Sequence, residues 1–242
     1  SGPLFAAEQV SIAVASNFTA TMQQLVAQFE QESGFAVSPS YGSTGKLFAQ
    51  IVNGAPYEIF LAADSERPAR LYRQRNMTAD EPFTYARGEL VLWAPHANST
   101  EQAQQQLQQG DFSFFAIANP KTAPYGVAAM EVLLKLGLDK RYLKQMVRGE
   151  NIAQTYQFIY SGNAQLGFIA KSQLRSAVEQ LPGAVWQVPQ QMYAPIEQQA
   201  VLLKRGENNP AAQAFMRFLR SDIARQLIVT SGYGMMDDAV TR

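Results

Sequence analysis

The feature that most constrains the fold is a repeated order of a short apolar strand, a loop and an amphipathic helix. Residues 10–14 alternate as a strand should, and apolar side chains at helical spacing follow at Met22, Leu25, Val26 and Phe29. Strands that alternate with helices predict an α/β fold with mainly parallel sheets covered by helices.

This strand and helix order continues to the end of the chain. Further strands are predicted over 35–38, 59–62, 89–93, 114–118, 166–169, 185–188 and 198–203. Helices are predicted over 47–52, 101–109, 127–134, 173–180, 210–219 and 222–230. A length of 242 residues allows one large core or two modest ones. No Gly/Ser-rich linker separates two halves, so two lobes would require the chain to cross between them more than once.

Composition excludes several classes of function. Twenty basic residues balance twenty acidic ones, so the chain lacks the basic surface of a nucleic-acid or anionic-membrane binder. There is no cysteine, which excludes disulfides, thiolate metal sites and cysteine nucleophiles. His96 is the only histidine, and its position at the end of a strand predicts a solvated loop residue. We therefore expect no catalytic metal.

Two features of the chain predict an exported protein without membrane insertion. No apolar run approaches the roughly 20 residues that span a bilayer. Residues 1–8 resemble the small-residue stub that remains after a signal peptide is removed.

Small, donor-rich loops stand between a strand and a helix at residues 15–19, 41–45 and 122–126. Helix N-termini carry unsatisfied N–H groups and a partial positive charge, so such loops can hold an anion without a cation. Ser, Thr and Asn are also ordinary N-cap residues, and a purely structural capping role stays open for each loop.

Two enzymatic interpretations of these loops fail on their motifs. Gly45-Lys46 after a strand suggests a nucleotide-binding P-loop, but that motif needs glycine at position 40 and Ser or Thr at 47. The chain has Ser40 and Leu47. A nucleophilic serine fails too, since no Gly-x-Ser-x-Gly elbow is present.

Several motifs, taken together, carry a resemblance to a known family. They are Ala15-Ser16-Asn17-Phe18, Tyr41-Gly42-Ser43-Thr44-Gly45-Lys46-Leu47, Asn53-Gly54-Ala55-Pro56, Ala62-Ala63-Asp64, Ala123-Pro124-Tyr125-Gly126, Leu166-Gly167-Phe168 and Gln198-Gln199-Ala200. In this order and spacing, over residues 8 to 235, the chain resembles the periplasmic molybdate-binding proteins of ABC transporters.

The resemblance implies a type II periplasmic-binding-protein fold, with the ligand in a cleft between two α/β lobes. Lobe 1 would comprise 8–87 and 197–242, and lobe 2 would comprise 88–196. The protein would be a periplasmic monomer and no enzyme, with no cofactor, that binds molybdate or tungstate and delivers it to an inner-membrane ABC permease.

The resemblance also implies which residues hold the oxyanion. They are Ser16 and Asn17 in the first loop, Ser43 and Thr44 in the second, Tyr125 in the third, and the backbone N–H of Ile152. The metal would be held only as its oxyanion, with no direct cation ligands. Some family members place a tyrosine where this chain has Ala170, and Tyr125 would supply the hydroxyl instead.

Neutral donors are chemically sufficient for a tetrahedral dianion, because each of its oxygens accepts several hydrogen bonds. Hydrogen phosphate would bind poorly, since its proton needs an acceptor and the three loops contain no Asp or Glu; Glu150 is expected to face solvent. The alternative ligands are sulfate or an organic carboxylate. A phosphoryl-transfer enzyme would need a metal or base that the sequence does not offer, and a structural adhesin would bind no oxyanion.

Overall fold

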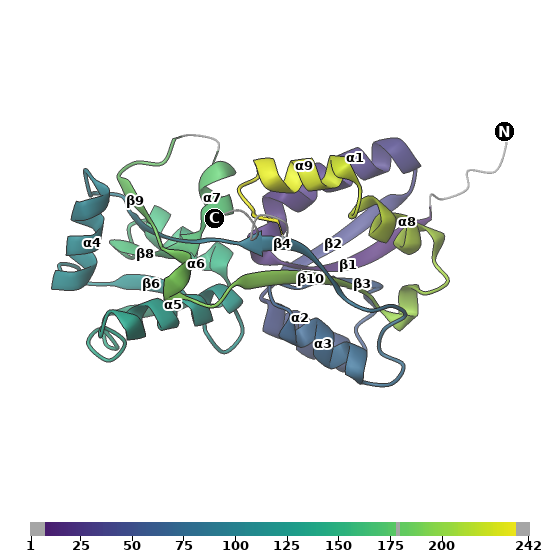
Figure 1. The fold of residues 1–242 in the computed structure, drawn as a ribbon, viewed down its shortest axis with the longest axis horizontal. Helices are drawn as coiled ribbons and strands as arrows, with labels where there is room; N and C mark the ends of the chain where they lie inside the picture. Colours follow the sequence, from purple (N-terminus) through teal and green to yellow (C-terminus); the bar gives the residue numbers. More distant parts are fainter. Residues whose placement is uncertain (1–7, 178–179, 236–242) are drawn as a thin grey trace.

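The computed structural model describes residues 8–177 and 180–235, and these form two five-stranded sheets that lie side by side with helices around them (Figure 1). The first sheet has the order β2 (Ala36–Gly42), β1 (Gln9–Ala15), β3 (Ile59–Leu61), β10 (Ile196–Leu202) and β4 (Phe83–Gly88). The second has the order β7 (Met146–Gly149), β6 (Phe115–Ala118), β8 (Leu166–Ala170), β5 (Leu90–Ala94) and β9 (Ala184–Gln187).

Both sheets are mainly parallel, as predicted, and each contains one reversed strand. β1, β2 and β3 are parallel and β10 runs against both β3 and β4. In the second sheet β6, β7 and β8 are parallel and β5 runs against both β8 and β9. β10 and β5 are also the strands by which the chain enters each sheet from the other one. They start at the junction of the sheets and run away from it, so the other strands run toward it.

The chain passes between the sheets at two places. Only Glu89 separates β4 from β5, and residues 188–195 separate β9 from β10. Both passages lie in the middle of the molecule, where β4 and β10 extend toward the second sheet (Figure 1).

Helices cover both faces of each sheet. They are α1 (Thr19–Ser33), α2 (Thr44–Val52), α3 (Glu66–Arg73), α4 (Thr100–Gln109), α5 (Pro124–Lys135), α6 (Ile152–Tyr160), α7 (Lys171–Arg175), α8 (Pro210–Phe218) and α9 (Asp222–Thr230), with short 3₁₀ turns η1 (Ser16–Phe18), η2 (Gln190–Met192) and η3 (Lys204–Gly206). In Figure 1, α1 and α9 lie on one face of the first sheet and α2 and α3 on the other. The predicted apolar face of α1 is confirmed, since Met22, Leu25 and Phe29 are buried.

The structure corrects two predicted helix faces. In the helix predicted over 127–134 the apolar pattern places Val127 and Leu134 in the core, but they are 44% and 64% exposed. α5 instead buries Ala128 and Ala129 beside Val132, because small side chains let the helix approach the sheet closely. Val52 is likewise exposed at the end of α2.

Other differences concern where elements begin and end. Strands β4 and β7 and helix α6 were not predicted. The helix expected over 173–180 is shorter and lies earlier in the chain, from Lys171 to Arg175. It begins directly after β8, because the Gln173 side chain accepts a hydrogen bond from the Ala170 N–H (2.9 Å). Residues 178 and 179 of that prediction lie outside the described residues, as do residues 1–7 of the predicted signal-peptide stub.

Candidate oxyanion site

Four helix N-termini gather where the two sheets meet. β1 and β2 end in register at Ala15 and Gly42, and η1 with α1 and then α2 follow these ends. In the second sheet β6 and β7 end in register at Ala118 and Gly149, ahead of α5 and α6. Because all four strands run toward the junction, their carboxyl ends place the loops there, the position where ligands bind in open α/β sheets.

Contacts across the junction bring the three predicted loops together. The Gly45 N–H donates to the Thr122 carbonyl (2.8 Å). The Asn17 Nδ2 lies 3.5 Å from the Tyr125 hydroxyl. Lys46 Nζ and Glu150 Oε1 form an ion pair at 2.6 Å, which adds the loop before α6 to the group. The loops of both lobes therefore face one another.

Ser43 and Thr44 offer two hydroxyl donors at the start of α2. Both are buried, and the Thr44 Oγ1 accepts a hydrogen bond from the Ala63 N–H (3.1 Å), which leaves its own proton for another acceptor. The Ser43 Oγ occupies the N-cap position but makes no cap bond and has no hydrogen-bond partner among the described residues. A buried hydroxyl without a partner costs about 1–3 kcal/mol, so this position favours a bound acceptor.

Ser16 and Asn17 form the turn η1 that joins β1 to α1. The Asn17 amide points into the protein, where its Nδ2 donates to the Gln198 Oε1 (2.6 Å) and the Tyr233 hydroxyl (3.0 Å). Its side chain is thus engaged within the protein, and the part of Asn17 that can serve an anion is its backbone N–H.

Tyr125 lies in the first turn of α5 and is 2% exposed. Burial raises the pKa of its phenol well above the usual value, so the hydroxyl stays protonated and can donate. The hydroxyl rests against Gly88, the last residue of β4, where an added Cβ would lie only 2.2 Å from the Tyr125 oxygen. Only glycine at position 88 leaves room for it.

Ile152 is the first residue of α6, and its side chain is buried. First-turn N–H groups have no partner within their own helix. Asn151 caps the helix by accepting from the Gln154 N–H (2.9 Å), which leaves the Ile152 N–H as a backbone donor at the junction. The Glu150 side chain is half exposed in its pair with Lys46, as expected.

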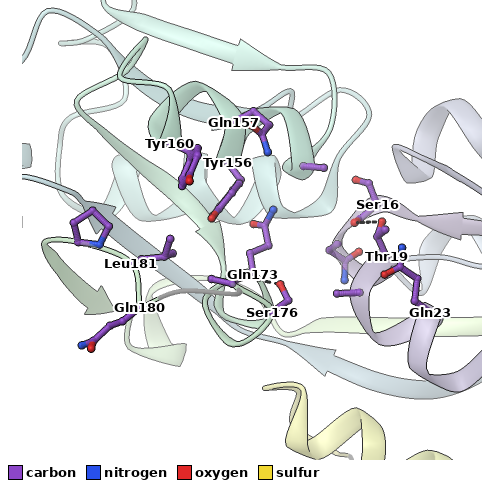
Figure 2. A pocket seen from close by; sticks show the side chains of 15 residues that line it. Ser16, Thr19, Gln23, Tyr156, Gln157, Tyr160, Gln173, Ser176, Gln180 and Leu181 are labelled. Carbon is purple, nitrogen blue, oxygen red and sulfur yellow. Dashed lines mark hydrogen bonds between the residues drawn. The ribbon is translucent and has the colours of Figure 1, made fainter.

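A cleft of about 720 Å³ opens beside this group of residues. Figure 2 shows Ser16 and Thr19 on one wall and Tyr156, Tyr160 and Gln173 on the other. Asn17 also lines it, but the other predicted site residues, Ser43, Thr44, Tyr125 and Ile152, do not. The structure therefore brings the predicted residues together beside the cleft, and of these residues only Ser16 and Asn17 line it.

Charge at the junction is balanced within the protein. Lys46 is paired with Glu150, and Arg67 is paired with Asp64. Within 8–177 and 180–235 no group of His, Cys, Asp and Glu could hold a metal ion, and His96 is exposed in a turn. In the same residues no helix has the length and apolar character of a membrane span. The attraction for an anion would come from helix N-termini and hydroxyls.

Two α/β lobes with neutral donors at their junction define a solute-binding protein. The family described as bacterial extracellular solute-binding protein matches residues 10–234, and the chain belongs to this family.

Particular relatives agree with the predicted resemblance. Over 229 residues the chain is 45% identical to the molybdate-binding protein ModA of Azotobacter vinelandii, a match that covers 95% of this chain and 91% of that protein. It is 40% identical over 228 residues to ModA of Rhodobacter capsulatus, which covers 94% of this chain and 89% of that protein. The solved structure of the Azotobacter vinelandii periplasmic molybdate-binding protein has a TM-score of 0.88 at 37% identity, and covers 93% of this chain and 99% of that one.

Proposed function

We propose that this protein captures molybdate outside the cytoplasm and delivers it to an ABC permease in the inner membrane. The observation that carries the proposal is the buried Ser43 hydroxyl without a partner, at a junction where four helix N-termini meet. The relatives named as molybdate-binding proteins support the choice of ligand.

The proposed shell consists of donors only. Four hydroxyls would donate to the anion, those of Ser16, Ser43, Thr44 and Tyr125. Two backbone N–H groups would donate as well, those of Asn17 and Ile152. Each charge-assisted bond contributes about 1.5–3 kcal/mol net, so six of them could offset dehydration and reach the roughly 8–12 kcal/mol of micromolar to nanomolar binding. A protonated anion would find no carboxylate acceptor in this shell, which favours molybdate over hydrogen phosphate.

Tungstate has the same charge and shape as molybdate, and we propose that it binds too. We propose lobe 1 as 8–87 with 197–242 and lobe 2 as 88–196, joined by the two passages at Glu89 and 188–195. Ligand contacts from both lobes would stabilise a closed state that the permease recognises. In this proposal the protein is a periplasmic monomer without enzymatic activity.

Thermal melting with single anions tests the proposal. A ligand that binds only the folded state stabilises it by mass action. At a hundredfold excess over the dissociation constant the free energy of unfolding increases by about 2.7 kcal/mol, and the melting temperature rises with it. We expect large shifts with sodium molybdate and sodium tungstate and none with phosphate. A shift with sulfate or an organic carboxylate alone would overturn the proposal that the ligand is molybdate. The absence of a shift with every anion would overturn the proposed anion site.

A further inference from the structure

Tyr233, which is outside the six predicted site residues, holds the turn that starts at Ser16. Its hydroxyl donates to the Asn17 carbonyl (2.8 Å) and accepts from the Asn17 Nδ2 (3.0 Å). One hydroxyl thus binds both the main chain and the side chain of the same residue. Burial raises the pKa of the Tyr233 phenol above its usual value, so the hydroxyl keeps the proton that it donates.

Contacts other than those with Asn17 also hold Tyr233 in place. Its ring packs edge-on against Phe18 with centroids 5.3 Å apart. The next residue, Gly234, pairs with β4: its N–H donates to the Arg87 carbonyl (2.9 Å), and the Arg87 N–H donates to the Gly234 carbonyl (2.8 Å). Arg87 lies two residues before Glu89, where the chain leaves the first sheet. The segment that carries the Tyr233 hydroxyl is therefore paired with β4, the strand that leads to the second lobe.

Asn17 is also held from a second direction. The Gln198 Oε1 accepts from its Nδ2 at 2.6 Å, and Gln198 is fully buried on β10, the other strand that joins the lobes. With its carbonyl and its amide both bound, Asn17 has little freedom to rotate. The direction of the N–H groups in η1 is then set before any ligand arrives, and preorganised donors bind without an ordering cost.

We propose that Tyr233 is a positioning residue for the anion site, which holds the Ser16–Asn17 turn in its binding orientation and connects it to the strand between the lobes. This inference rests on the proposed function. It adds a residue 216 positions away from Asn17 in the sequence to the determinants of anion affinity.

Tyr233→Phe tests the inference, because it removes the hydroxyl and keeps the ring against Phe18. With sodium molybdate in isothermal titration we expect the dissociation constant to rise about tenfold, as two hydrogen bonds that order the turn are lost. Tyr142→Phe is the matched control: Tyr142 is a buried phenol of the second lobe that donates to the Gln108 carbonyl (3.0 Å). We expect both variants to lower the ligand-free melting temperature, and only Tyr233→Phe to weaken binding.

A second measurement does not depend on any ligand. Amide hydrogen exchange at residues 16–18, followed by NMR in the ligand-free protein, should be faster in Tyr233→Phe than in wild type or Tyr142→Phe. Wild-type exchange and wild-type affinity in Tyr233→Phe would overturn the inference. Failure of wild type to bind molybdate would overturn the proposed function instead, and the exchange rates would then decide whether Tyr233 orders the turn.

Discussion

Removal of the Ser43 hydroxyl should weaken anion binding without lowering the stability of the ligand-free protein. Ser43→Ala removes a buried oxygen that has no partner, so the ligand-free free energy of unfolding should stay the same or increase by about 1 kcal/mol. The same change removes a donor to the anion, and we expect the molybdate dissociation constant to rise at least tenfold, since a charge-assisted bond contributes about 1.5–3 kcal/mol. Thermal melting and isothermal titration measure the two effects.

Ser33→Ala is the control for this experiment. The Ser33 Oγ donates to the Phe29 carbonyl (2.7 Å) at the far end of α1, so its loss should lower the melting temperature without changing the affinity. Unchanged affinity in Ser43→Ala would remove Ser43 from the site.

Single residues differ in how far the sequence could predict them. Local sequence indicated the donor-rich loops that contain Ser16, Ser43 and Thr44, and the resemblance to the family singled out these three residues within them. The direction of the Asn17 amide was not predictable, because it depends on Gln198 and Tyr233, which are 181 and 216 positions away. No local pattern identifies partners at such separations.

At the scale of elements, Lys46 in the first turn of α2 and Glu150 before α6 form a charged pair across the junction. Both side chains are half exposed, so the pair contributes only about 0–1 kcal/mol to stability. Their charges act oppositely on a nearby dianion. Glu150→Gln should therefore strengthen molybdate binding a few-fold at low salt, and Lys46→Met should weaken it by a similar factor.

Titrations in low and high salt measure this pair. The two variants should approach the wild-type affinity at about 1 M salt, where the screening length is near 3 Å. If both substitutions weakened binding, the pair would act mainly as a link that holds α2 and α6 together, and the electrostatic prediction would be wrong.

Elements with strong periodicity were predictable and short ones were not. α1 was expected because apolar side chains recur at helical spacing from Met22 to Phe29, and α9 was expected over its observed bounds, 222–230. β7 has only four residues and is partly exposed, so it shows no apolar run. α6 was missed although Asn151 followed by Gln154 is a recognisable start signal, since Asn151 caps the helix through the Gln154 N–H.

For the whole molecule, buried tyrosines predict a loss of stability at alkaline pH. Burial raises the pKa of the phenols of Tyr85, Tyr125 and Tyr233, whereas unfolded tyrosine titrates near pH ~10. Above that pH the unfolded chain releases protons that the folded protein keeps, so each group lowers stability by about 1.4 kcal/mol per pH unit.

Melting temperatures between pH 7 and 11 check this prediction, because the contribution of these tyrosines is fully present below pH ~10 and is lost above it. Tyr85→Phe should make the decline less steep. A decline as steep as in wild type would show that other groups control it.

The division into two lobes could not be derived from periodicity, which predicts α/β units but not which sheet each strand joins. The resemblance to a family supplied that division. The structure adds a physical reason: a strand that enters from the other lobe starts at the junction, so β5 and β10 run opposite to their neighbours.

Closure of the lobes should depend on the size of residue 45. The Gly45 N–H donates to the Thr122 carbonyl, and a Cβ at Gly45 would lie 2.9 Å from the Thr122 Cα on the opposite lobe. In the series Gly45→Ala and Gly45→Val, we expect molybdate affinity to fall as the side chain grows. X-ray scattering should show compaction with molybdate in wild type and progressively less in the variants. The ligand-free melting temperature serves as the internal control, since the shortest contact of the added Cβ is with the opposite lobe. Full compaction and wild-type affinity in Gly45→Val would mean that the two loops do not meet when the ligand binds.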